Sequence, residues 1–274
     1  MKSVIHLCLL LLASACNAAN ILGFLPFYGI SHNRVSMPLM EELARRGHNV
    51  TVAGYFEPKT PSPNLRTILF KPLEGAELVG FLSLKDYQDA HYMTTMQLIN
   101  VIFDDYPALL KKNDYHRIYE GDYDLVIVEF FESDLFPAFA SKLKAPFIVF
   151  HTSEALPWHR TILNEYNSPA EIPHPFNSYG SNGKMGFYER FWNTVEIAQM
   201  LFYYTTVIQP KADSLAKEHL GCLNSEFSKA KEASLYFVNT HFSFTGPRPT
   251  SPSTIEVGGL HVAPRKALAQ VSRR

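Results

Sequence analysis

The sequence predicts an α/β fold, a mostly parallel sheet covered by helices on both faces. Short apolar runs bounded by turn residues recur along the chain, as expected of strands buried on both faces. Segments with helical spacing of apolar residues lie between these runs, so strand and helix alternate. A chain of 274 residues, 46% of them hydrophobic, is long enough to bury such a core.

The first elements form a βαβ unit. We expect a strand over residues 21–27, a helix from about Val35 that stops at Gly47, and a strand over residues 49–55. Pro38 is expected in the first turn of this helix, because a helix interior tolerates proline poorly. Gly47 is a typical helix stop, since glycine readily adopts the conformation that follows a last turn.

The later segments continue the alternation. Helices are expected over residues 86–112, with an interruption near Pro107, and over residues 135–143. Further strands are expected over residues 65–70, 124–129, 146–150, 234–238 and 255–257.

A long amphipathic helix is expected after residue 186. One stripe on it is aromatic and aliphatic, and we expect most of that stripe to pack in the core. The stripe consists of Phe187, Phe191, Val195, Ala198 and Phe202.

The amino-terminal segment is typical of a secretory signal peptide, residues 1–18, cleaved near Ala18. Lys2 provides a basic start, residues 7–15 are almost entirely apolar, and small residues follow. The apolar run is shorter than the ~20 residues that a membrane-spanning helix needs. We therefore expect a mature chain that is soluble within the secretory pathway.

Cysteine usage and one sequence triplet add two expectations. Cys8 and Cys16 lie in the signal segment, so Cys222 is left alone and no internal disulfide can form. Residues 49–51, Asn-Val-Thr, are an N-glycosylation triplet, but they lie in a predicted strand. Burial in that strand would hide the triplet, and we expect it to be unused.

The charge balance and the absence of short motifs exclude several function classes. The formal net charge is −1 and no basic face stands out, so neither a nucleic acid nor an anionic membrane is an expected partner. The sequence has no H-x-x-x-H, C-x-x-C or H-E-x-x-H spacing for a metal. It also has no phosphate-binding glycine loop and no G-x-S-x-G nucleophile elbow.

Three polar clusters follow predicted strands. They are residues 31–33 with His32, residues 129–134 with Glu129, and residues 151–154. The carboxyl ends of parallel strands bind ligands, and a histidine beside a carboxylate there can remove a proton. An ordinary loop residue is the alternative for His32, whereas His159 and His174 are expected in loops without an identifiable partner.

Six segments between residues 20 and 266 together resemble the amino-terminal half of UDP-glycosyltransferases, the glucuronosyl- and glucosyltransferases of animals. The insect branch is the most similar. The segments are "ILGFLPFYGISHNRVSMPLMEELARRGHNVTV", "YDLVIVEFFESDLF", "PFIVFHTSE", "MGFYERFWN", "SLYFVNTHFSF" and "EVGGLHVAPRK".

The resemblance implies a GT-B architecture, in which two Rossmann-like domains face each other across a cleft. Residues 19–266 correspond to the domain that holds a small lipophilic acceptor. The other domain holds the co-substrate, UDP-glucose or UDP-glucuronic acid, with no metal and no further cofactor. His32 matches the general base that deprotonates the acceptor hydroxyl, whose oxygen then displaces UDP with inversion. With its signal segment, this chain is expected in the endoplasmic reticulum lumen. Full-length relatives are membrane-anchored, and no anchor is expected in this chain.

The residue that assists His32 departs from the family pattern. The family has an aspartate at the end of the strand that reads "DLVIVE" here, so the matching residue is Glu129. Asp134, five residues further on, is the alternative, and Glu129 is preferred because it ends the strand. The resemblance also implies acceptor contacts from Phe130, Phe131, His151, Ser153 and Phe187.

Residues 267–274, "ALAQVSRR", follow the last matching segment, and we expect them to be a truncated tail without the donor domain. One reading is a UDP-glycosyltransferase of which this chain carries the acceptor half, inactive in isolation. The alternative is a lipophile-binding or regulatory half-enzyme that forms homo- or hetero-oligomers with full-length relatives. The presence of a donor domain separates the two readings.

Overall fold

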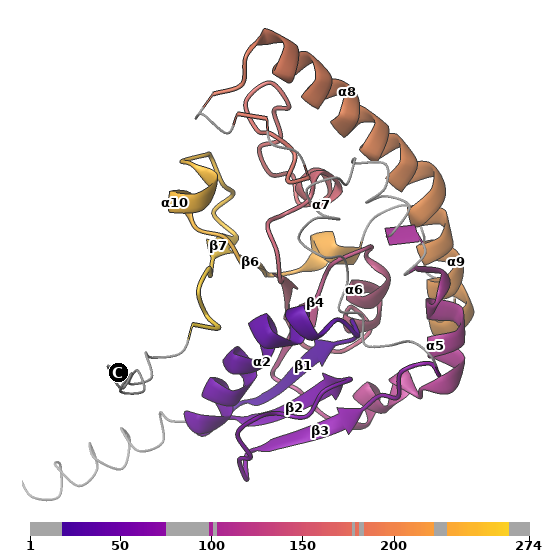
Figure 1. Ribbon diagram of the computed structural model, residues 1–274. Helices are drawn as coiled ribbons and strands as arrows, with labels where there is room; N and C mark the ends of the chain where they lie inside the picture. The colour runs from indigo at the N-terminus through magenta and orange to yellow at the C-terminus, as the bar shows by residue number, and fades with distance from the viewer. Residues whose placement is uncertain are drawn as a thin grey trace, which may run out of the picture.

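The computed structural model describes residues 18–74, 99–100, 103–176, 179–180, 184–221 and 229–262 (Figure 1). Several predictions lie outside these residues. They are the signal segment up to residue 17, most of the helix expected over residues 86–112, Cys222 and the tail.

One sheet of seven parallel strands organises the described chain, in the order β3-β2-β1-β4-β5-β6-β7. Every expected strand is present, and each begins and ends within two residues of its predicted bounds. The sheet was expected to be mostly parallel, and its described strands pair in parallel throughout. The strands are β1 (Asn20–Leu25), β2 (Asn49–Gly54), β3 (Leu65–Leu69), β4 (Leu125–Glu129), β5 (Phe147–His151), β6 (Leu235–Val238) and β7 (Thr254–Glu256).

Helices cover both faces of this sheet, which confirms the expected fold class (Figure 1). On one face, α2 (Ile30–Arg45) packs on β1, β2, β4 and β5 through a compact apolar cluster. On the other face, a larger and more aromatic core includes α5 (Tyr106–Lys112), α6 (Leu135–Ala140) and α9 (Gln209–Leu220). Successive residues of β1 enter the two cores alternately, as the pleat of a strand requires.

Helix α2 begins at Ile30, five residues before the predicted start, so His32 lies in its first turn and not in a loop. Pro38 is therefore inside the helix, and its expected place in the first turn is wrong. Proline lacks the N–H that would bond to the carbonyl of Arg34, but Arg34 is exposed, so water can satisfy that carbonyl. Gly47, with φ of +96°, follows the helix end as predicted.

A close contact seats α2 on β1. A Cβ atom on Gly23 would lie 2.5 Å from the sulfur of Met40, which is fully buried under the helix. Because Gly23 has no side chain, α2 approaches the strand closely there. This contact helps to fix the position of the first turn, which carries His32.

The remaining helices form one long column and several short segments. Helix α8 (Phe187–Tyr203), a π-helical turn (Tyr204–Ile208) and α9 follow one another without a break and run along one side of the molecule (Figure 1). Among the described helices, none has the length and apolar content needed to cross a membrane. The short segments are 3₁₀ turns at Tyr115–Glu120 and Lys229–Glu232, α7 (Pro157–Ile162) and α10 (Phe242–Thr245).

The predicted core stripe of α8 is wrong. Phe187, Phe191 and Phe202 are 77%, 53% and 70% exposed. The helix instead buries a face that includes two polar residues, and that face consists of Asn193, Glu196, Ile197 and Met200.

Candidate active site

Three side chains from separate elements meet at the carboxyl edge of the sheet. His32 is in the first turn of α2, Glu129 ends β4, and Thr152 follows β5. The imidazole Nδ1 of His32 lies 2.6 Å from the Glu129 Oε1 and 2.6 Å from the Thr152 Oγ1. The Thr152 hydroxyl lies 3.2 Å from the same Glu129 oxygen. Strand β4 pairs with both β1 and β5, which brings the three chain segments together.

One placement of protons satisfies all three contacts. The Nδ1–H of His32 donates to Glu129 and to the Thr152 oxygen, and the Thr152 hydroxyl donates to Glu129. Glu129 is 3% exposed, so these donors supply the partners that a buried carboxylate needs. The arrangement leaves the Nε2 of His32 as a proton acceptor, with no hydrogen bond to any other described residue.

Two neighbouring aromatic rings pack against the imidazole. The ring centroid of His32 lies 4.3 Å from that of Phe27 and 4.4 Å from that of Phe131. Phe27 and Phe131 also contact each other, with centroids 5.0 Å apart. The His32 side chain remains 14% exposed. The ring is thus fixed against an apolar wall and still reachable from outside.

The structure brings Glu129, and not Asp134, to His32. The carboxylate of Asp134 accepts hydrogen bonds from the side-chain amide of Gln209, at 2.9 Å, and from the backbone N–H of Lys229, at 3.0 Å. These contacts connect the start of α6 with α9 and the 3₁₀ turn near Lys229.

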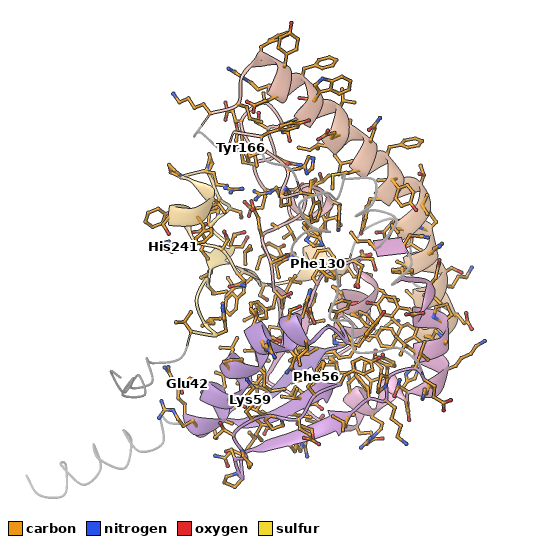
Figure 2. All side chains as sticks on the ribbon, in the orientation of Figure 1. Glu42, Phe56, Lys59, Phe130, Tyr166 and His241 are labelled. Atoms are coloured by element: carbon orange, nitrogen blue, oxygen red, sulfur yellow. The ribbon has the colours of Figure 1, made fainter. Side chains whose placement is uncertain are left out.

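The other predicted site residues occupy three different settings. Phe131 contacts His32, whereas Phe130 and His151 are each 1% exposed and contact each other in the interior, where Figure 2 labels Phe130. The Ser153 hydroxyl is half-buried and donates to the backbone carbonyl of the next residue. Phe187 starts α8, 77% exposed and far from α2 in Figure 1.

Strand alternation explains these settings. Ile127, Ile148 and Phe150 belong to the core beneath α2. Since side chains two residues apart share a face, Glu129 and Thr152 continue these rows on the side of His32. Phe130 and His151 are on the opposite face for the same reason. Thr152 belongs to the polar cluster at residues 151–154, but no sequence signal distinguishes it there, because β5 is buried on both faces and shows no alternation.

Two buried histidines lie behind the site. His159 is on α7, and its Nε2–H donates to the backbone carbonyl of Phe131 at 2.5 Å. Its predicted loop position without a partner is therefore wrong. Burial lowers the pKa of His151 to about 3 and holds that of His159 well below its usual value, so both rings are neutral. The bond from His159 supports the chain segment that carries the Phe131 wall.

A second carboxyl group lies close to Glu129 in the sequence. Glu132 is 3% exposed, and one of its oxygens accepts a 2.7 Å hydrogen bond from the Tyr106 hydroxyl. The other oxygen has no hydrogen-bond partner among the described residues. Burial raises the pKa of Glu132 to about 8, so this carboxyl is mostly protonated at neutral pH. Within the described ranges, no group of three or more metal-ligating side chains could hold a metal ion.

Comparisons with known proteins agree with the resemblance seen in the sequence. The model of the family described as "UDP-glucoronosyl and UDP-glucosyl transferase" matches residues 85–273. UDP-glucosyltransferase 2 of Dactylopius coccus is 32% identical over 266 residues, which cover 92% of this chain and 49% of the relative. UDP-glucuronosyltransferase 2B30 of Macaca fascicularis is 24% identical over 253 residues, which cover 84% of this chain and 47% of the relative.

Among solved structures, the calicheamicin glycosyltransferase CalG4 is similar, with a TM-score of 0.41 at 17% sequence identity, over 88% of this chain and 53% of that chain. The chain spans about half the length of the curated relatives it matches. The residues matched by the family model make up more than half of the chain and include Glu129 and Thr152. The chain belongs to the UDP-glucuronosyl and UDP-glucosyl transferase family.

Proposed function

We propose that this chain forms the acceptor-binding half of a UDP-glycosyltransferase in which His32 is the general base. The observation that carries the proposal is the contact of the His32 Nδ1 with both Glu129 and Thr152 at 2.6 Å. This contact fixes the tautomer and leaves the Nε2 free to take a proton. The exposed part of the ring gives a substrate hydroxyl access to that nitrogen.

The proposed reaction moves one proton and one sugar. The Nε2 of His32 takes the proton of the acceptor hydroxyl as its oxygen attacks the anomeric carbon of the UDP-sugar. The bond from that carbon to the UDP oxygen breaks, UDP leaves with the electron pair, and the configuration inverts. Glu129 stabilises the imidazolium that forms, and Thr152 holds the carboxylate in place.

The surroundings of His32 support a small lipophilic acceptor. Phe27 and Phe131 contact each other and together form an apolar wall beside the base, and such a wall favours apolar ligands. The contact of Phe131 with the His32 ring supports a direct acceptor contact for Phe131, and Phe130 and His151 are buried on the opposite face of the sheet. The acceptor contact of Ser153 stays a prediction. The exposed position of Phe187 gives its predicted acceptor contact no support.

The sugar donor is assigned to a second domain of the GT-B type. Transfer needs both reactants held in line, and such positioning contributes roughly 7–11 kcal/mol to lowering a barrier. We assign glucose or glucuronic acid as the sugar, with no metal and no additional cofactor. The signal-like residues 1–18 support a location in the endoplasmic reticulum lumen.

A second candidate function is that of a lipophile-binding or regulatory partner. The chain spans about half the length of the curated relatives it matches. A polypeptide limited to this half would bind lipophilic acceptors without transferring sugar, and it would act through pairing with full-length relatives. Incubation of the purified chain with a labelled UDP-sugar and a panel of phenols tests this candidate. Donor-dependent product above the level of a His32→Ala control would contradict this candidate.

The enzyme proposal is tested by the same substitution in this chain completed with a donor domain of the family. His32→Ala is expected to lower kcat by about 10²–10⁴-fold, because a general base acts in the transition state. Acceptor affinity should change only a few-fold. His116→Ala, at an exposed histidine of the 3₁₀ turn Tyr115–Glu120, is the matched control and should leave kcat unchanged. Near-normal turnover of His32→Ala would show that His32 is not the base.

A further inference from the structure

The N-glycosylation triplet at residues 49–51 is more accessible than its place in a strand suggests. Asn49 is the first residue of β2 and is exposed, while Val50 and Thr51 are buried. The expected burial of Asn49 is therefore wrong, and with it the reason to expect an unused triplet. The Asn49 Nδ2 donates a 3.2 Å hydrogen bond to the Oδ1 of Asn20, which is also exposed. No other Asn-x-Ser/Thr triplet occurs in the 274 residues.

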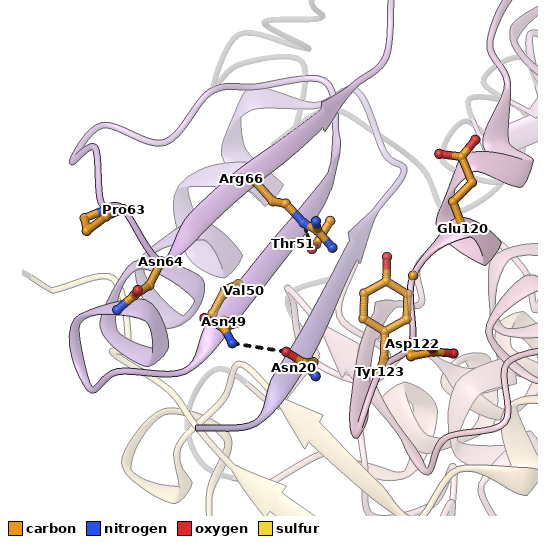
Figure 3. Close-up of a pocket in the computed structure, with 11 residues that line it drawn as sticks. Asn20, Asn49, Val50, Thr51, Pro63, Asn64, Arg66, Glu120, Asp122 and Tyr123 are labelled. Atoms are coloured by element: carbon orange, nitrogen blue, oxygen red, sulfur yellow. Dashed lines mark hydrogen bonds between the residues drawn. The ribbon is translucent and has the colours of Figure 1, made fainter. Parts of the chain in front are cut away.

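An open polar hollow of about 520 Å³ lies beside this side chain (Figure 3). It sits at the amino ends of β1, β2 and β3, so it is at the opposite edge of the sheet from His32. A sugar attached there meets polar groups and open solvent. The lining includes Asn20, Asn64, Arg66, Glu120, Asp122 and Tyr123.

We propose that Asn49 carries an N-linked glycan. The donor is an oligosaccharide attached to a lipid pyrophosphate of the secretory-pathway membrane. A bond forms between the anomeric carbon of the first sugar and the Asn49 Nδ2, which loses one proton. The bond from that carbon to the pyrophosphate oxygen breaks, and the lipid pyrophosphate leaves with the electron pair. This proposal is independent of sugar transfer to an acceptor at His32.

The folded structure can accommodate the product. The glycosylated nitrogen keeps one hydrogen, which can still be donated to the Oδ1 of Asn20. The glycan would extend from the amino edge of the sheet and leave the carboxyl edge with His32 uncovered. The glycan at Asn49 and the candidate active site at His32 can therefore occupy the same domain.

The burial of Thr51 in the fold determines when the glycan can be attached. A glycosylating enzyme recognises the hydroxyl of the triplet, but in the fold that hydroxyl is 3% exposed and accepts a 2.7 Å hydrogen bond from the Nε of Arg66. Thr51 also pairs with both Leu22 and Arg66 in the sheet. Transfer must therefore precede pairing of β2, while the chain is being synthesised.

The test is expression of the whole chain in insect cells and digestion of the denatured product with peptide N-glycosidase. We expect one increase in gel mobility and conversion of Asn49 to aspartate, read by mass spectrometry. Asn49→Gln should abolish the shift, and Asn64→Gln, in the same hollow, should not. Thr51→Ser keeps the triplet and should retain the glycan, whereas the near-isosteric Thr51→Val should lose it.

Two further readouts make the result decisive. Translation with microsomes present should give protected, glycosylated chain, whereas microsomes added after folding should give none. A chain that is protected in microsomes but unmodified at Asn49 would overturn the proposal, as would a chain that never enters them. Because the glycan is read on denatured protein, a variant that folds poorly still gives an answer.

Discussion

At the scale of single residues, the setting of His32 depends on which side of the sheet each neighbour faces. Position at strand ends was enough to predict that the polar clusters with His32 and Glu129 share one edge of the sheet, and the family resemblance selected Glu129 as the partner. The two side chains lie 2.6 Å apart. Position at strand ends was not enough to choose Thr152 over His151. That choice requires knowing which face of β5 lies under α2, and a strand buried on both faces does not reveal it.

Removing the charge of Glu129 should lower kcat, whereas removing the charge of Asp134 should lower the free energy of unfolding. Glu129→Gln keeps the shape but cannot stabilise an imidazolium, so kcat of the complete transferase should fall about 10²-fold or more. Asp134→Asn should leave kcat near normal and lower the free energy of unfolding by about 1–3 kcal/mol, because its carboxylate bridges Gln209 and Lys229. Steady-state kinetics and urea unfolding measure the two effects. A larger loss of kcat in Asp134→Asn than in Glu129→Gln would show that Asp134, and not Glu129, assists His32.

Thr152 should act as a positioning residue through its hydroxyl. Thr152→Val removes the hydrogen bond to Glu129 and should lower kcat about tenfold, consistent with the loss of ~1.5 kcal/mol. Thr152→Ser keeps the hydroxyl and should restore most of the rate. Equal rates for the valine and serine variants would show that the hydroxyl has no part in orienting His32.

At the scale of elements, strands were easier to predict than helix faces. Apolar runs bounded by turns identify buried strands directly, whereas a helix face can be buried through polar residues. In α8, the Asn193 Oδ1 accepts from the backbone N–H of His174, and its Nδ2 donates to the carbonyl of Ile172 at 2.8 Å. Glu196 pairs with the His174 side chain at 2.7 Å. Because apolar spacing ignores such residues, it selected the exposed aromatic stripe.

The two faces of α8 should respond oppositely to substitution. Phe202→Ser, at a side chain 70% exposed, should change the free energy of unfolding by no more than about 0.5 kcal/mol. Met200→Ala, at a fully buried position, should cost about 2–5 kcal/mol. Urea unfolding of the two variants gives the comparison. If Phe202→Ser lowers the free energy of unfolding as much as Met200→Ala does, the aromatic stripe is part of the core.

The start of α2 illustrates a second reason why elements were misplaced. Its first turn, residues 30–34, has few apolar residues, because most of the turn lies at the protein surface and only His32 faces the candidate site. The helix nevertheless begins there, and His32 gains the rigid support of a helix. The neighbourhood of His32 and Glu129 was thus predicted from the sequence, while the element that holds His32 was not.

At the scale of the whole molecule, buried ionisable groups couple stability to pH in opposite directions. Glu132 has a pKa of about 8 in the fold and 4.5 when unperturbed, so the folded state holds a proton that the unfolded state releases. Stability therefore falls as pH rises through this window. His151, with a pKa lowered from 6.5 to about 3, and His159 have the reverse effect, so stability falls as pH drops below about 6.5.

These opposing groups predict a stability maximum near pH 6.5, with each proton contributing up to about 1.4 kcal/mol per pH unit. Glu132→Gln removes the ionisation but keeps an acceptor for the Tyr106 hydroxyl. It should therefore flatten the decline between pH 6.5 and 8, and it should steepen the rise between pH 4.5 and 6.5, where proton release from the unfolded-state Glu132 opposes the effect of the histidines. Thermal unfolding of both proteins across pH 4–9 measures this. An unchanged alkaline limb would show that Glu132 is not protonated in the fold.

The central claim, that His32 removes the acceptor proton, is tested most directly with acceptors of different acidity. The ratio of wild-type to His32→Ala turnover is measured in the complete transferase on a series of phenols and alcohols of similar size. We predict a loss of about 10²–10⁴-fold for weakly acidic hydroxyls, shrinking towards unity for phenols that are already ionised in the buffer, because these need no base. A loss of the same size across the whole series would contradict the account and leave His32 a purely structural role.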